Sequence, residues 1–171
     1  MSETGHDIRL NPLPLRKPAG HTGYDIYPSF RLQEGLIATG YRPLAERLLK
    51  HRILVIDGYN GVFWDRLRDE ICAVATEKGK TVQWIHTGQF LKPEKVIREM
   101  TADNSGGEDP LFGRRCELEL ADFLDLQDLK RTVPDNSYDI CIIAGPDAAL
   151  AGWHGLNIYV DLPKNELQYR A

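Results

Sequence analysis

The sequence has few cysteines, no long apolar run and no excess of basic residues. Its three cysteines, Cys72, Cys116 and Cys141, are too far apart to form a C-x-x-C pair, so neither a zinc site nor a disulfide framework is predicted. The longest apolar runs are only a few residues, far short of a membrane span. The N-terminus lacks the charged and apolar segments of a secretory signal. We therefore expect a cytoplasmic protein with no membrane partner.

Basic residues are also slightly outnumbered by acidic ones. Lys and Arg total 21 against 25 Asp and Glu, which gives a formal net charge of −4 at pH 7. No basic stripe is visible, and a nucleic-acid surface normally needs clustered Lys and Arg, so we expect no nucleic-acid partner. The length of 171 residues and the hydrophobic content of 42% suit one globular domain with a tail.

What the sequence does contain is an alternation of apolar strand patterns with helical patterns. Residues 1–30 are rich in Pro and Gly and are predicted to form an extended arm, and residues 31–171 form the α/β domain. Strands are predicted at residues 53–56, 82–86, 140–143 and 156–160, and helices at residues 43–50, 62–78, 93–100 and 125–133. The pattern predicts a three-layer parallel sheet with helices on both faces. Residues 53–56 are expected at its centre, between 140–143 and 158–160, with 82–86 beyond 140–143.

The first strand runs into Asp57, Gly58, Tyr59, Asn60 and Gly61, and then into a helix. Glycines at such a turn let backbone N–H groups and the helix N-terminus face an anion. A working phosphate loop also supplies a Lys and a Ser or Thr, as in G-x-x-x-x-G-K-[ST]. After Gly61 the sequence instead has an aliphatic residue and two aromatic residues, Val62, Phe63 and Trp64. A tight turn without a ligand explains the two glycines equally well.

Several segments resemble known families. Residues 85–91, 142–145 and 157–170 are similar, in layout and short matches, to uridine kinases. Residues 24–28, 56–64, 109–113, 148–153 and 161–168 together resemble the N-terminal extension of long-form class I mannose-6-phosphate isomerases. In that family a kinase-like domain precedes a zinc-dependent cupin domain. The resemblance implies a degenerate P-loop kinase-like fold that belongs to a longer isomerase, with a C-terminal cupin partner and zinc only in that absent domain.

The departures from the kinase pattern bear on catalysis. The phosphate-loop Lys and Ser or Thr are absent, and Gly88 and Ala144 stand where uridine kinases have an activating Asp and a Glu. Phosphoryl transfer depends on positioned cations and a base, so their joint loss predicts a chain that is inactive alone. His86 and His154 lack a metal-ligand partner at close spacing, so no metal and no cofactor is expected in this chain.

We therefore predict a non-catalytic domain that binds a sugar phosphate or nucleotide. The predicted phosphate site consists of Gly58, Tyr59, Asn60 and Gly61 with Arg114 and Arg115, although a solvated surface pair explains the two arginines as well. Further candidates near the strand ends are Asp57, Trp64, His86, Asp161, Lys164 and Arg170.

Two alternatives stay open. The first is an active small-molecule kinase that binds magnesium through Asp57 or Asp161. The second is an assembly module, in a homo-oligomer or with the partner domain, that docks through Tyr24, Tyr27, Phe63 and Trp64.

Overall fold

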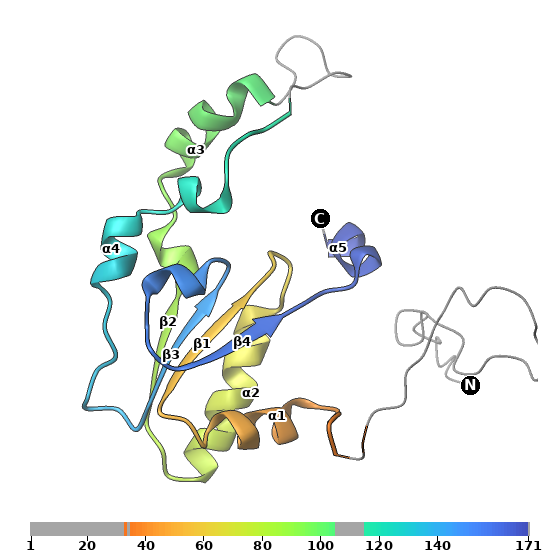
Figure 1. The fold of residues 1–171 in the computed structure, drawn as a ribbon, viewed down its shortest axis with the longest axis vertical. Coiled ribbons are helices and arrows are strands. Elements are labelled where there is room, and N and C mark those ends of the chain that lie inside the picture. Colours follow the sequence, from red (N-terminus) through yellow and green to blue (C-terminus); the bar gives the residue numbers. More distant parts are fainter. Residues whose placement is uncertain (1–32, 34, 105–114, 171) are drawn as a thin grey trace, which may run out of the picture.

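The computed structural model describes residues 33, 35–104 and 115–170. Its centre is a sheet of four parallel strands, β1 (Ile53–Gly58), β2 (Val82–His86), β3 (Ile140–Gly145) and β4 (Leu156–Val160). The strand order is β2-β3-β1-β4 (Figure 1). This confirms the predicted parallel sheet with β1 inside it and β2 outside β3. The predicted arm, residues 1–30, lies outside the described residues.

The two central strands are the most apolar, as a sheet covered on both faces requires. All six residues of β3 are buried, and Leu54, Val55 and Ile56 of β1 are at most 2% exposed. The two strands pair from Ile53 opposite Cys141 to Asp57 opposite Gly145. Alternate residues therefore serve two different cores, one on each face of the sheet.

One face of the sheet is covered by α1 (Tyr41–Leu48) and α2 (Trp64–Glu77) (Figure 1). Leu67, Ile71 and Val74 recur at helical spacing along α2 and are at most 6% exposed, so they form the stripe that meets the sheet. The helices are also joined at the surface, where the Arg42 guanidinium contacts the Glu77 carboxylate at 2.7 Å.

The opposite face is covered by α4 (Leu126–Arg131), by the 3-10 turn η5 (Ala148–Ala151) and by Trp153. The Trp153 indole N–H donates to the Thr132 carbonyl at 2.9 Å, so this buried ring has its polar atom satisfied. Asp125 caps α4, because its carboxylate accepts from the N–H groups of Gln127 and Asp128 at 3.1 Å.

Helix ends differ from the predicted ones by one or two residues. α4 stops at Arg131, before the predicted 133, because residue 133 precedes Pro134 and is disfavoured in a helix. α1 begins at Tyr41 and not at Pro43. Pro43 therefore lies in the first turn of the helix, where proline is tolerated. α2 begins at Trp64 and not at residue 62, since Gly61 has a φ of +89° and the chain turns there first.

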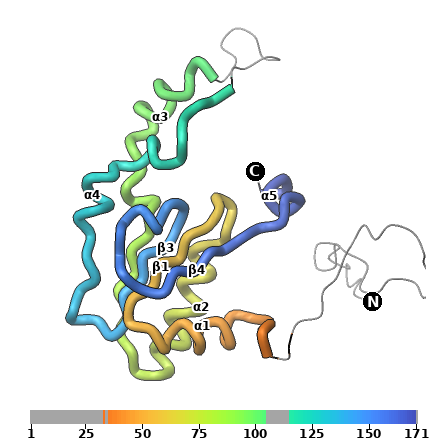
Figure 2. Tube along the Cα trace, in the orientation of Figure 1, coloured from red at the N-terminus to blue at the C-terminus, as the bar shows by residue number. Residues whose placement is uncertain are grey.

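The remaining elements lie toward the carboxyl ends of the strands. They are η2 (Thr87–Phe90), α3 (Glu94–Thr101), η3 (Ala102–Asn104), η4 (Leu120–Phe123) and α5 (Lys164–Arg170). Figure 2 shows α3 and α5 on opposite sides above this end of the sheet. Among the described helices, none has the length and apolar character needed to cross a membrane.

Candidate functional site

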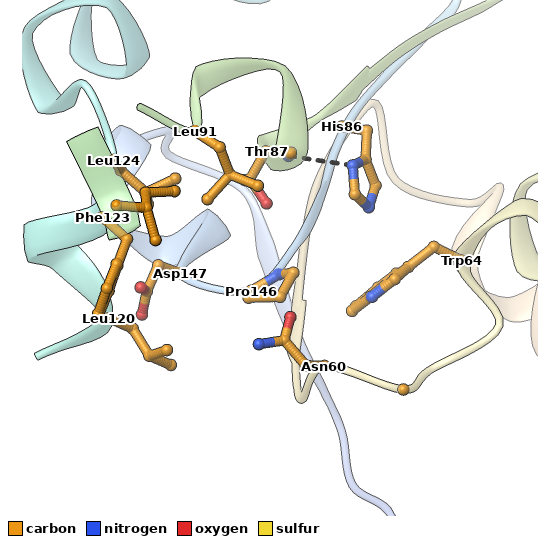
Figure 3. A pocket seen from close by; sticks show the side chains of 13 residues that line it. Asn60, Trp64, His86, Thr87, Leu91, Leu120, Phe123, Leu124, Pro146 and Asp147 are labelled. Carbon is orange, nitrogen blue, oxygen red and sulfur yellow. Dashed lines mark hydrogen bonds between the residues drawn. The ribbon is translucent and has the colours of Figure 1, made fainter. Parts of the chain in front are cut away.

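A cavity of about 400 Å³ opens at the carboxyl ends of the strands (Figure 3). Its residues come from the end of β2, the turns after β1, β2 and β3, the start of α2, helix α3 and the segment around η4. They are Asn60, Gly61, Trp64, His86, Thr87, Gly88, Leu91, Ile97, Leu120, Phe123, Leu124, Pro146 and Asp147. The carboxyl edge of a parallel sheet is where open α/β proteins bind ligands, so this cavity is the candidate site.

The apolar wall of the cavity is held in place by a short antiparallel contact. Leu91 bridges to Leu124, and the Lys92 N–H donates to the Phe123 carbonyl at 2.8 Å. In Figure 3 the side chains of Leu120, Phe123 and Leu124 gather at one end of the cavity, and the rings of Trp64 and His86 lie at the other. A bound molecule would therefore meet aliphatic and phenyl side chains at one end and the Trp64 and His86 rings at the other.

His86 ends β2, and its two ring nitrogens differ. Nδ1 accepts from the Gly88 N–H at 3.0 Å, so the proton of the neutral ring is on Nε2. Nε2 is enclosed and has no hydrogen-bond partner in the described part of the chain. Burial lowers the pKa of the imidazole, a shift that Asp65 opposes and Arg68 adds to, so the ring favours its neutral form.

Trp64 is the first residue of α2 and stands beside His86. The two rings meet edge to face, with 5.9 Å between centroids and 65° between planes. The indole Nε1 is likewise enclosed, with no acceptor among the described residues. Trp64 and His86 also border an outer hollow formed with residues 62, 63, 65 and 66, so the two rings form a partition between this hollow and the cavity.

Asp57 is the next-to-last residue of β1 and ties the strand to the turn after β3. Its Oδ1 accepts from the N–H groups of Gly58 at 2.7 Å and Asp147 at 3.1 Å, and its Oδ2 accepts from the Ala149 N–H at 3.0 Å. Both carboxylate oxygens are thus engaged by backbone donors. This arrangement makes Asp57 a structural clamp at the edge of the cavity.

Asp147 lines the cavity and was not singled out from the sequence. Its φ of 60° puts a residue other than glycine in the left-handed region, where it begins η5. Burial, reinforced by the nearby charges of Asp57 and Glu119, raises the pKa of its carboxyl. A strained residue with a shifted pKa at a cavity wall is a common mark of a binding site. The sequence feature that could have indicated Asp147 is its position just after the end of β3.

The predicted phosphate loop is divided by the fold. Asn60 and Gly61 line the cavity, but Gly58 and Tyr59 do not. A side chain at Gly58 would place its Cβ 2.5 Å from the Val160 carbonyl oxygen, so this glycine is needed for close packing against β4. Tyr59 is 44% exposed and packs edge to face on Tyr159.

The predicted cations lie elsewhere. The Arg170 guanidinium donates to the Gly61 carbonyl at 2.8 Å, contacts the Glu166 carboxylate at 2.9 Å and stacks on the Phe63 ring at 4.0 Å. Arg170 therefore reaches the predicted loop, but its charge is already paired. Arg115 is exposed and does not line the cavity, and Arg114 lies outside the described residues.

The remaining two candidates follow β4. Asp161 is exposed, and its Oδ1 accepts from the next residue's N–H at 2.8 Å, while Lys164 is the exposed first residue of α5. Across residues 33, 35–104 and 115–170, no cluster of three His, Cys, Asp or Glu side chains has the placement to hold a metal ion. Several other residues line the cavity but were not predicted from the sequence to belong to a site. They are Thr87, Leu91, Ile97, Leu120, Phe123, Leu124, Pro146 and Asp147.

Comparison with known proteins gives one match. The model of a family described as a domain of unknown function (DUF8485) matches residues 40–171. Neither the curated proteins nor the solved structures give a significant match to the chain. The matched region begins one residue before α1 and so takes in all four strands and every residue that lines the cavity.

Proposed function

The chain belongs to the DUF8485 family, and we propose that this domain binds a small molecule in its cavity without catalysing a reaction. The observation that carries this proposal is the cavity at the carboxyl edge of the sheet, with two buried N–H donors, Trp64 Nε1 and His86 Nε2, on its border. Unpaired buried donors are rare in folded proteins because each costs free energy. A site for a ligand is a physical reason for keeping them.

The absence of catalysis is supported by the environment of the carboxylates and cations. Asp57, the strand-end carboxylate nearest the predicted loop, accepts three backbone N–H groups, which occupy most of its about four acceptor sites. Among the described residues that line the cavity there is no Lys or Arg. Phosphoryl transfer requires such groups around the transferred phosphate.

The resemblance to mannose-6-phosphate isomerases supports two more specific proposals. A sugar phosphate or nucleotide is the first ligand class to test, with the phosphate outside the apolar part of the cavity. A cupin isomerase domain, joined at the C-terminal side, is the proposed partner. The kinase-like relationship of the fold itself is part of the same proposal, and the β2-β3-β1-β4 order supports it only as a parallel α/β arrangement.

The test is a stability screen with a cavity-filling variant. Phosphorylated sugars, their unphosphorylated forms and nucleotides are added to the full chain, and a ligand that binds only the folded state raises the melting temperature. Leu120→Trp fills the apolar wall, because Leu120 lines the cavity and is half exposed. Val133→Trp adds the same ring at a residue that is 68% exposed and does not line the cavity.

If the domain binds a ligand in this cavity, we expect the stabilisation by that ligand to be lost in Leu120→Trp and kept in Val133→Trp. ATP consumption is measured in parallel with uridine and simple sugars. Turnover above background that disappears in Asp57→Ala would replace the binding proposal with the kinase alternative.

A second candidate function is an assembly module, favoured by exposed aromatic surface. Phe63 is 56% exposed, and Tyr59 and Tyr159 form an exposed pair. Trp64 is half-buried, and Tyr24 and Tyr27 lie outside the described residues. Solution mass measured for the native chain and for Phe63→Ser separates this function from ligand binding, because only an assembly would lose mass in the variant.

A further inference from the structure

We propose that the cavity takes an uncharged portion of its ligand, with a carbonyl-type oxygen that accepts hydrogen bonds from Trp64 Nε1 and His86 Nε2. The proposal rests on the proposed binding function and specifies the chemistry of the ligand. Two features carry it: the pair of unpartnered ring donors and the lack of cationic side chains around the cavity.

Trp64 and His86 each have a ring N–H that can donate a hydrogen bond. The His86 Nδ1 accepts from Gly88, so Nε2 carries the proton and acts as a donor, and an indole nitrogen is always a donor. Both nitrogens are enclosed and lack acceptors. The two rings meet edge to face with 5.9 Å between centroids, so we infer that one ligand oxygen between them would satisfy both donors, whereas a ligand without an acceptor would leave both unpaired.

A ligand oxygen must also be able to reach the two ring nitrogens. The nitrogens are closed to solvent, so the ligand oxygen reaches them when the Trp64 indole shifts. Room for that shift exists, because Trp64 and His86 separate the cavity from the outer hollow that both rings border. In Figure 3 the imidazole lies above the indole, and Asn60 and Pro146 lie beside the two rings, so the space between the rings borders the cavity. A small rotation of Trp64 would open this space from the cavity side.

The charged side chains that line the cavity disfavour an anionic ligand. The lining residues that the structure describes include one carboxyl group, Asp147, and no Lys or Arg. A phosphate or carboxylate inside the cavity would meet this carboxyl without a balancing cation, which is costly in a poorly solvated space. An uncharged amide avoids that cost. Its carbonyl matches the ring donors, and the apolar atoms of such a ligand match Leu91 and Phe123.

The experiment compares four probes that share a phenyl ring: benzamide, ethylbenzene, benzoate and phenyl phosphate. The full chain is labelled with ¹⁵N, and the three tryptophan side-chain N–H signals are followed during titration. Trp64→Phe identifies the Trp64 signal, and the Trp153 N–H, which is bonded to Thr132, is the internal control. Benzamide is expected to move the Trp64 signal and to bind about a hundredfold more tightly than ethylbenzene, as two hydrogen bonds worth about tenfold each would give.

Two substitutions of His86 test its role as a donor with side chains that are also polar. His86→Asn keeps an acceptor near the Gly88 N–H and removes the distal donor, and it should weaken benzamide binding about tenfold. His86→Gln restores a distal N–H and should recover most of that affinity. Tyr159→Phe, on the exposed pair outside the cavity, should bind benzamide like the native chain.

The outcomes separate the two proposals. If benzamide and ethylbenzene bind alike and in the cavity, the binding function stands and the acceptor inference is wrong. Tighter binding of phenyl phosphate or benzoate than of benzamide would overturn the inference about charge. If no probe and no compound of the stability screen binds in the cavity, both proposals fail together.

Discussion

The carboxylate of Asp57 accepts the backbone N–H of Asp147 at 3.1 Å, and this contact joins the end of β1 to the turn that follows β3. The same carboxylate accepts the Ala149 N–H at 3.0 Å. Two neighbouring strands are therefore held together at the edge where the cavity opens. The contact also presents Asp147, in its left-handed conformation, to the cavity.

Removing this clamp should destabilise the fold. We expect Asp57→Ala to lower the free energy of unfolding by about 2 kcal/mol, because hydrogen bonds to a charged group are among the stronger ones. Asp161→Ala is the matched control, since it removes an exposed strand-end carboxylate bonded to the next residue's N–H. Its expected change is within about 0.5 kcal/mol. Urea unfolding at pH 7 measures both, and equal losses would contradict the clamp.

Neutralising Asp147 should stabilise the protein near pH 7. Burial and the charges of Asp57 and Glu119 raise the pKa of this carboxyl above its unfolded value, so its charged form is disfavoured in the folded state. As the pH falls, the folded native chain takes up the proton first and gains stability. Asp147→Asn should therefore melt at a higher temperature at pH 7, with the difference shrinking toward about pH 4.

Melting curves between pH 7 and 4 test this pattern, with Asp161→Asn as the exposed control. Asn also tolerates the left-handed backbone, so the substitution isolates the charge. A difference that stays constant with pH would show that the carboxyl charge is not the cause.

Lowering of the His86 pKa should make stability depend on pH in the opposite sense. The unfolded histidine titrates near its ordinary value of 6.5, and the folded one titrates below it because the ring is buried. Stability present above pH 6.5 is lost as the pH falls, since the unfolded state binds the proton first. Asp65 weakens this effect and Arg68 strengthens it.

Replacement of His86 should flatten that dependence. His86→Gln is expected to reduce the fall in melting temperature between pH 7 and 5, and His154→Gln, at an exposed position, is expected to leave it unchanged. An identical fall in both variants and in the native chain would refute the assignment to His86.

Gly145 should be intolerant of any side chain. A Cβ at this position would lie 2.1 Å from the Thr87 Oγ1, in a backbone with φ of +130°. We expect Gly145→Ala to cost about 3 kcal/mol, because the buried Thr87 would have to move in addition to the backbone strain. Gly79→Ala is the control, since it has a φ of +66° and nothing within 4 Å, and should cost about 1 kcal/mol. Chemical denaturation compares the two.

Sequence patterns predicted the sheet better than the cavity. The apolar runs of β1 and β3 and the right-handed rule for parallel connections were enough to place the strands in order, because each run is buried on both faces. Helix ends were less accurate, since they depend on single backbone angles such as that of Gly61. That angle delays α2 by two residues relative to the prediction.

For the site, sequence patterns predicted some of the residues near the strand ends and missed others, among them Thr87 and Pro146. Asn60, Gly61, Trp64 and His86 were all candidates, and all line the cavity. The apolar wall around Phe123 was not predicted, because that segment is irregular and shows no period, and its position depends on a bridge to the turn after β2. The Arg170 contact to Gly61 was foreseen as a reach to this edge, but the pairing of its charge with Glu166 was not.

The strand order has a consequence for biosynthesis. β1 is made early, but its two neighbours are β3 and β4, and roughly ninety residues separate Ile53 from its partner Cys141. At about 5–20 residues per second, the ribosome leaves β1 without neighbours for several seconds. During that time α1 and α2, which pack on the sheet in the folded protein, are available to shield the apolar strand. Folding is therefore expected to be late and slow, with chaperone binding centred on residues 53–58, and truncation before β3 should yield an aggregating product.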